Sequence, residues 1–202
     1  MKRIKNALVF LVAGWSGFFI MGVELLSGRA LAPFFGNSIY VWGGVITVFM
    51  LALSLGYLLG GQLSTFSPSL ARLGWLLIAA GVAVLPVVLI GDPVLDWIFD
   101  HVHDPRYGSL LASSILFFVT TVISGTVSPY AIRLLATDLN VSGKSAGSLY
   151  FVSTFGSAAG TLITSFYLVL YFELNQLFLG MTVVSIAIGA LAIFLGGSSD
   201  ER

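Results

Sequence analysis

Apolar residues fill six long blocks of this chain, and most charged and turn-forming residues fall between the blocks. About 20 apolar residues span a hydrocarbon core of about 30 Å, and the blocks are near or above that length. Because lipid offers backbone groups no hydrogen-bond partner, we expect each block to form a helix. The predicted membrane helices cover residues 7–31, 40–63, 73–90, 109–135, 148–171 and 174–195, within one all-α domain over residues 1–202.

The stretch that follows Gly91-Asp92-Pro93, where we expect the third helix to end, has the pattern of a short surface helix. Its apolar residues fall near one helical face with aspartates between them, so residues 93–104 are predicted to lie in the membrane interface. His101 and His103 could join these carboxylates in a Zn or Cu site. On a helix the two imidazoles point about 200° apart, which favours a solvated polar face without a metal.

The distribution of Lys and Arg predicts the orientation of the six helices. One side of the membrane would hold Arg29 and Arg106, and the other would hold Lys2, Arg3, Lys5, Arg72, Arg133, Lys144 and Arg202. The positive-inside rule then places both termini in the cytoplasm, and we expect the protein in the inner (cytoplasmic) cell membrane. A basic start before an apolar run is also typical of a cleaved signal, but the run from Ala7 to Val23 is longer than a usual signal core.

The composition agrees with a membrane domain and excludes several functions. Only 9% of the residues are charged and 57% are hydrophobic, whereas soluble domains carry about 25% charged residues. Nine basic and nine acidic residues give no net charge, so no basic field would attract nucleic acid. Without cysteine, the chain has no disulfide, thiolate nucleophile or cysteine-bound metal centre.

An internal repeat relates the two halves of the chain. A shift of 104 positions lays Val23, Glu24, Arg29 and Leu31 on Val127, Ser128, Arg133 and Leu135, and a shift of 110 lays Ser38, Tyr40, Tyr57 and Leu58 on Ser148, Tyr150, Tyr167 and Leu168. The first helix thus matches the fourth and the second matches the fifth. We therefore expect an inverted 3+3 repeat, as in each six-helix half of the major facilitator fold. Arg29 and Arg133 would then occupy equivalent helix ends.

Several of these segments also resemble a known family. The stretch from Gly22 to Ser38, then Tyr40-Val41-Trp42 and Leu55 to Gly61, is similar to the membrane half of the fused major facilitator and spermidine synthase family. Ser128 to Arg133, Gly147 to Tyr150 and Ser153 to Thr161 extend the likeness to nearly the whole chain.

This resemblance implies half of a facilitator-like fold. In that family a cytoplasmic domain similar to aminopropyltransferases often follows the helices, and since this sequence stops at Arg202 we expect the membrane part alone. Facilitators generally carry an Asp-Arg pair in the loop after the second helix. Gly61-Gln62-Leu63-Ser64 lacks both charges, so a salt-bridge gate at that loop is in doubt.

Two glycine motifs predict where helices approach each other closely. Gly56 and Gly60 lie four residues apart on the second helix, as do Gly156 and Gly160 on the fifth. These faces would either pack within one chain or form a homodimer. We expect a two-fold homodimer, because a six-helix half needs a second copy to enclose a central path.

Glu24 is the only carboxylate that this topology places inside a membrane helix. A charge at the membrane centre costs on the order of 2.5–3.5 kcal/mol, so Glu24 should face a polar cavity, pair with a cation or stay protonated. The alternative is that it reaches outward or pairs with Arg29, although a spacing of five residues is poor for such a pair. We expect Glu24 to face the fourth helix near Ser128 and Tyr130 and to be the cation or proton site that couples transport.

These features favour a secondary transporter built from two copies. The alternative is a membrane scaffold or anchor for a separately encoded synthase-like enzyme. We expect no enzyme activity and no cofactor, because the helices carry no carboxylate pair, activated nucleophile or cofactor motif. The resemblance suggests a polyamine or another small organic cation as substrate, with charge from Glu24 and aromatic faces from Tyr40, Trp42, Tyr57, Tyr130 and Tyr150, although these rings are also typical of membrane anchors and packing.

The predicted orientation can be checked by thiol labelling, because the chain has no cysteine of its own. Cysteines placed singly at Ile4 and Asp200 are expected to resist an impermeant thiol reagent in intact cells. A cysteine at Asp104 is expected to react. Labelling of either chain end from outside would contradict the orientation.

Overall fold

The computed structural model describes residues 2–135 and 142–200, with side chains described for 3–135 and 143–196. Six helical spans in this part of the chain are long and apolar enough to cross a membrane, which confirms the predicted six membrane helices. Arg202 and the side chain of Lys2, both counted in the charge bias, lie outside the described residues. The spans are α1 (Lys2–Phe35), α2 (Ile39–Leu63), α3 with α4 (Leu70–Val82 and Leu85–His101), α5 (Pro105–Leu135), α6 with the π-helix η2 and α7 (Ser142–Ile163, Thr164–Leu168 and Val169–Tyr171), and α8 (Leu174–Asp200).

Local backbone chemistry sets the ends of α1 and α2. Helix α1 continues through Pro33 to Phe35, so the predicted range 7–31 is too short at both ends. It ends where Gly36 adopts φ +79°, a left-handed conformation that glycine tolerates without a Cβ clash. Ser38 then begins α2, because its hydroxyl accepts a hydrogen bond from the Val41 N–H (3.5 Å).

The third span breaks earlier than the sequence predicts. A turn at residues 83–84 separates α3 from α4, just before Pro86, which has no N–H to donate. Two carbonyls at this break accept side-chain hydrogen bonds from neighbouring helices. The Thr120 hydroxyl donates to the Ala83 carbonyl (2.7 Å), and the Thr182 hydroxyl donates to the Gly81 carbonyl (2.9 Å). Polar side chains of α5 and α8 thus stabilise the broken backbone.

Residues 93–104 do not form the separate interfacial helix that the sequence predicts. Helix α4 runs without interruption through Gly91, Asp92 and Pro93 to His101. Leu95 and Ile98, on the apolar face assigned to the membrane interface, are instead buried in the core of the protein. The Phe99 ring lies 6.3 Å from the Phe34 ring. Burial of this face against α1 and its neighbours stabilises the helix across the proline.

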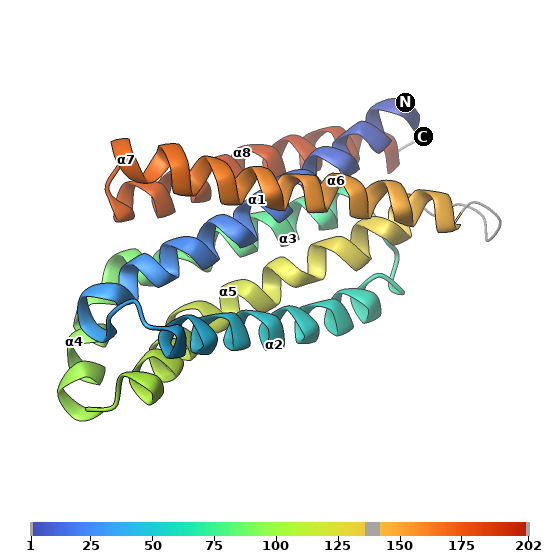
Figure 1. The fold of residues 1–202 in the computed structure, drawn as a ribbon. Helices are drawn as coiled ribbons and strands as arrows, with labels where there is room; N and C mark the ends of the chain where they lie inside the picture. The colour runs from blue at the N-terminus through green and yellow to red at the C-terminus, as the bar shows by residue number, and fades with distance from the viewer. Residues whose placement is uncertain (1, 136–141, 201–202) are drawn as a thin grey trace.

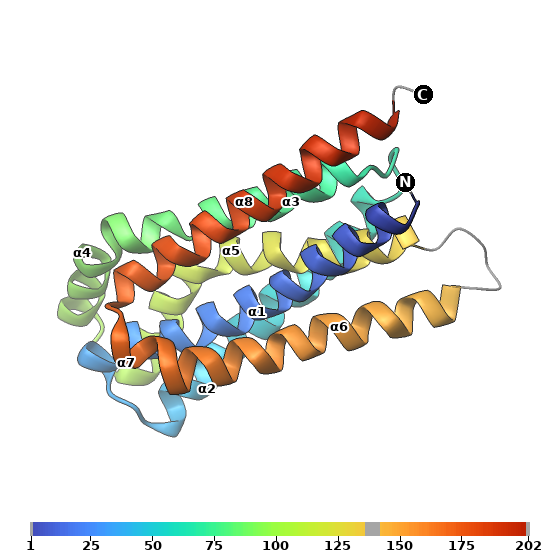
Figure 2. The same ribbon diagram turned by 90° about the horizontal axis from the view of Figure 1, so that it is seen from above.

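The six spans form two layers. In the first layer α2 packs on α5, α5 on α1 and α1 on α6, while α3 and α8 pack together behind them. Figure 1 shows α2 and α5 side by side, with α6 on the far side of α1, and Figure 2 shows α3 and α8 on the opposite side of the bundle from α6. We call the surface of the first layer that is turned away from α3 and α8 the open face. The start of α1 and the end of α8 share one end of the bundle, here the terminal end, and the α4–α5 connection lies at the far end.

The glycine motifs pack inside one chain. A Cβ built on Gly56 would lie 2.8 Å from the Gly125 Cα of α5, and one on Gly156 would lie 3.1 Å from the Gly14 Cα of α1. Gly60 and Gly160 are equally close to backbone atoms, of Thr126 and Phe18 respectively. These four glycines therefore hold α2 on α5 and α6 on α1, and the alternative that they form the dimer interface is wrong.

Replacing Gly156 with Ala should lower the stability of the fold. The added methyl group meets backbone atoms of α1 that cannot rotate away, and overpacking of this kind costs about 1–3 kcal/mol. Thermal unfolding in mild detergent should show a lower midpoint. Gly147→Ala on the same helix is the matched control, because nothing lies within 4 Å of a Cβ at that position. Equal midpoints for the two variants would contradict this packing.

Candidate functional site

The candidate site lies on the open face and is centred on Glu24 of α1. Gly22, two residues earlier, faces α8 and the end of α6, since a Cβ there would lie 3.4 Å from the Met181 sulfur and 3.3 Å from the Thr164 hydroxyl. Successive residues of an α-helix are about 100° apart, so Glu24 points roughly opposite to Gly22. The carboxylate is therefore directed away from α8.

The glycines that share a side of α1 with Glu24 show which helices flank it. Gly17, two turns earlier, faces α6, where the Ser157 hydroxyl would lie 2.9 Å from an added Cβ. Gly28, one turn later, faces the Trp42 ring of α2. Glu24 lies between these two positions on the helix surface and is half-buried. Its side chain is thus directed at the space between α6 and α2.

No hydrogen bond or ion pair links the Glu24 carboxylate to another residue in the described part of the chain. The Ser27 hydroxyl donates to the Glu24 backbone carbonyl (2.7 Å) and leaves the carboxylate unbonded. Arg29 does not serve as its partner. The Arg29 guanidinium donates to the Val169 carbonyl at the end of the α6 span (2.9 Å), as favoured for a cation at a helix C-terminus.

The expected approach of Glu24 to Ser128 and Tyr130 is wrong. The Ser16 hydroxyl lies 3.5 Å from the Ser124 carbonyl, and this contact fixes the register of the antiparallel helices α1 and α5. At 1.5 Å per residue, Glu24 lies about 12 Å from this contact toward the far end, and Tyr130 about 9 Å toward the terminal end. Tyr130 is 2% exposed, and its hydroxyl accepts a hydrogen bond from the Ser69 N–H (3.2 Å). Tyr130 is therefore a core residue, and Ser128 is buried close to it in sequence.

Tyr57 and Tyr150 lie near each other on opposite flanks of the open face. Their hydroxyls are close enough to interact electrostatically, although Tyr57 lies on α2 and Tyr150 on α6. Both rings are exposed. The contact of Gly14 with Val152 places Tyr150 about 18 Å from Glu24 along α1, toward the terminal end. The two tyrosines and the carboxylate therefore mark the two ends of one face.

A row of hydroxyl groups on α6 connects these ends. Ser153, Ser157 and Thr161 are half-buried, and their spacing of four residues puts them on one side of the helix, which faces Gly17. The Ser157 hydroxyl donates to the Ser153 carbonyl (3.1 Å), and the Thr161 hydroxyl donates to the Ser157 carbonyl (3.0 Å). We call this row, with Glu24, Tyr57 and Tyr150, the polar strip.

Comparisons with protein-family models, with curated proteins and with solved structures find no match to this chain.

Two hydroxyls of the polar strip, those of Ser157 and Thr161, are available to a ligand as acceptors. Because Ser157 and Thr161 give their protons to helix carbonyls, the lone pairs of their oxygens are what they can present to a ligand. Glu24 adds a carboxylate at one end, and the tyrosine rings add π faces at the other. Such a surface suits a cation that passes between successive acceptors.

Two other predicted site residues lie at the ends of the bundle, away from the strip. Tyr40 is exposed at the far end, where the Arg106 guanidinium carbon lies 4.8 Å from the centre of its ring. Arg133 is exposed in the last turn of α5, at the terminal end. His101 stacks on Trp97 with ring centres 4.6 Å apart, and the described residues hold no group of three or more His, Asp or Glu side chains that could bind a metal.

The hydroxyl row was missed by the sequence reasoning, although a signal for it exists. Ser153, Ser157, Thr161 and Ser165 repeat every four residues through a predicted membrane helix. This signal is hard to separate from helix packing, because Ser153 and Ser157 overlap the Gly156–Gly160 motif. The η2 π-helix that follows, at Thr164–Leu168, has no such signal.

Cross-linking can test the proximity of these two tyrosines across the open face. A chain carrying Tyr57→Cys and Tyr150→Cys is expected to form an intramolecular cross-link with a bifunctional thiol reagent, because the two side chains are near enough to interact electrostatically. The shift should be seen on a denaturing gel of monomeric chains. Tyr40→Cys with Tyr150→Cys, which joins opposite ends of the bundle, is the control and should not link. Equal linking of both pairs would contradict the arrangement.

Proposed function

We propose that this chain is one half of a homodimeric secondary transporter for small organic cations, with the open faces of two copies enclosing the path. The observation that carries the proposal is Glu24. It is a half-buried carboxylate inside a membrane span, directed at the open face, with no ion pair among the described residues. A residue of this kind is expensive in lipid and is by default a functional candidate.

The arrangement of the helices supports a facilitator-like half. In an inverted 3+3 repeat, α1 is equivalent to α5, α2 to α6, and α3 to α8. The contact between α2 and α5 in one half is then equivalent to the contact between α6 and α1 in the other. The contact between α3 and α8 is equivalent to itself. These three pairs are the main packing contacts of the bundle. Arg29 and Arg133 lie near the C-terminal ends of the antiparallel helices α1 and α5, so they are at opposite ends of the bundle and also fit equivalent positions of such a repeat.

The exposure of the polar strip supports a second copy. In a single chain, Glu24 and the half-buried hydroxyl row would lie partly open to lipid, which cannot solvate a charge. Helix α6 is the least buried of the six described spans, and α2 is covered on little more than its α5 side. A two-fold related copy would convert this face into the wall of a shared cavity.

The substrate class follows from the acceptors. An ammonium group would pair with the Glu24 carboxylate at one end of the strip, donate hydrogen bonds to the hydroxyl oxygens along it, or lie against the rings of Tyr57 and Tyr150 at the other end. A chain with several ammonium groups, such as a polyamine, would contact several neighbouring acceptors at once. This chemistry agrees with the substrate that the family resemblance implies.

Uptake by reconstituted protein tests the proposal through Glu24. Proteoliposomes should accumulate labelled spermidine, and Glu24→Gln should lower the initial rate about tenfold or more. Loss of one opposite charge near 4 Å, at an effective dielectric constant of about 20, removes more than the 1.4 kcal/mol that a factor of ten requires. Glu173→Gln, which neutralises an exposed carboxylate outside the strip, is the matched control and should keep the parental rate.

Two results would contradict the proposal. If Glu24→Gln transports like the parent from pH 5 to pH 8, Glu24 is not the cation or coupling site. If parent protein, shown to be folded by its thermal unfolding, transports none of a panel of polyamines and other organic cations, the membrane scaffold becomes the better reading.

A further inference from the structure

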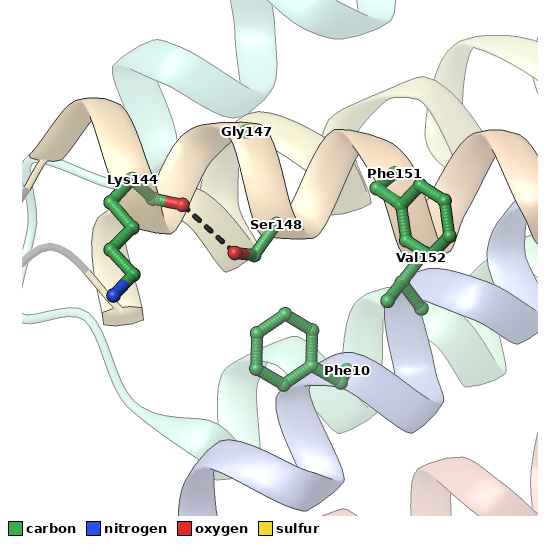
Figure 3. Close-up of a pocket in the computed structure, with 6 residues that line it drawn as sticks. All are labelled: Phe10, Lys144, Gly147, Ser148, Phe151 and Val152. Atoms are coloured by element: carbon green, nitrogen blue, oxygen red, sulfur yellow. Dashed lines mark hydrogen bonds between the residues drawn. The ribbon is translucent and has the colours of Figure 1, made fainter.

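A second surface lies on the other side of α6 from the polar strip, in a groove that begins between α1 and α6 and continues along α1 toward α8. Its first section, at the terminal end, is lined by Phe10, Lys144, Gly147, Ser148, Phe151 and Val152. Figure 3 shows Ser148 and Val152 of α6 directed toward Phe10 of α1, with the Lys144 ammonium group at the mouth of the gap between the two helices. The Ser148 hydroxyl is bonded to the Lys144 carbonyl (2.9 Å), so the mouth presents the ammonium group as its free donor.

Two further hollows continue this groove along α1. The middle hollow shares Phe10 and Val152 with the first and Trp15 and Phe18 with the third, so the three are continuous. Their remaining lining residues are mostly apolar and come chiefly from α1, α6 and α8. The floor of the groove is therefore apolar, and the groove is open to the membrane along its side.

The length of the first two sections matches one lipid leaflet. From Lys144 to Gly156 helix α6 rises about 18 Å at 1.5 Å per residue. One leaflet of the hydrocarbon core is about 15 Å thick, half of about 30 Å. An acyl chain whose headgroup lies at Lys144 would therefore reach the level of Trp15 and Gly156.

The charges at the mouth of the groove select the headgroup. Arg3 lies two helical turns before Phe10 on α1 and so shares its side of the helix, which places a second exposed cation near the mouth. Among the residues with described side chains, the acidic ones other than Glu24 all belong to α4 or to the connections at the far end. No described carboxylate therefore competes for Lys144 and Arg3, and an anionic group is favoured there.

We propose that this groove binds one anionic phospholipid, with the phosphate between Lys144 and Arg3 and an acyl chain along Phe10, Val152 and Trp15. The site is separate from the polar strip, because Glu24 and Gly22 face opposite sides of α1. The proposal is therefore independent of the transport function. The lipid would lie over α1, between helices α6 and α8, which do not pack closely on each other over their described residues.

Fluorescence quenching of Trp15 tests this site. The parent for the test retains Trp15 and has Phe at Trp42, Trp75 and Trp97, and it is reconstituted in phosphatidylcholine vesicles that contain lipid brominated in the middle of the acyl chain. Brominated phosphatidylglycerol is expected to quench Trp15 more strongly than brominated phosphatidylcholine at equal mole fraction. Lys144→Gln should lower the apparent preference for the anionic lipid roughly fivefold, the effect of one cation at an anionic headgroup.

Matched variants separate a bound lipid from general surface attraction. Arg133→Gln removes a cation from the same end of the bundle but not from the groove, and should keep the preference. Gly147→Leu adds a side chain to the first section, where no atom lies within 4 Å of an added Cβ, and should reduce quenching by both lipids, whereas Gly61→Leu on α2, equally open at its Cβ, should not. The proposal would be overturned if Lys144→Gln and Arg133→Gln lowered the preference for the anionic lipid equally. It would also be overturned if the parent showed no such preference, or if Gly147→Leu left the quenching of Trp15 unchanged.

Discussion

The structure depends on the close approach of helix backbones at glycine. In lipid, apolar side chains gain little by meeting each other, so helices associate where small residues allow van der Waals contact along their backbones. Gly56 and Gly60 place α2 on α5, and Gly156 and Gly160 place α6 on α1. These contacts use up the glycine faces of both outer helices. The glycine contacts leave the open face uncovered, and the polar strip to which we assign the proposed function lies on that face.

Helix α1 connects the two surfaces to which we assign a role. One side of it carries Glu24 and faces the gap between α2 and α6, and the opposite side carries Phe18 and Gly22 and faces α6 and α8. Helix α6 separates these surfaces and is held mainly by its glycine contact with α1. A lipid in the α6–α8 groove would therefore support the same helix that carries the hydroxyl row. The substrate and the lipid would then contact opposite sides of α6.

The sequence predicts the number of spans and the presence of Glu24 in one of them, because both follow from hydropathy and charge alone. It does not predict which helices meet. Gly56 and Gly156 look alike in sequence whether they contact a second copy or the same chain, and only the tertiary arrangement decides. Tyr130 fails for the same reason, since its bond to Ser69 joins positions far apart in the chain. Pro93 predicts a helix end, because proline removes a backbone hydrogen bond. The helix continues because the burial of Leu95 and Ile98 outweighs that loss.

The proposed contact of two copies through their open faces is tested most directly by the distance between the same residue in the two copies. A single spin label at Met50 of α2, on the same side of that helix as Tyr57, reports only on pairs of chains when the protein is held in nanodiscs. The account predicts a well-defined distance for Met50 that is shorter than the distance for a label at Val183 of α8, on the opposite layer. Absence of any dipolar signal from Met50, or a shorter distance for Val183, would contradict it.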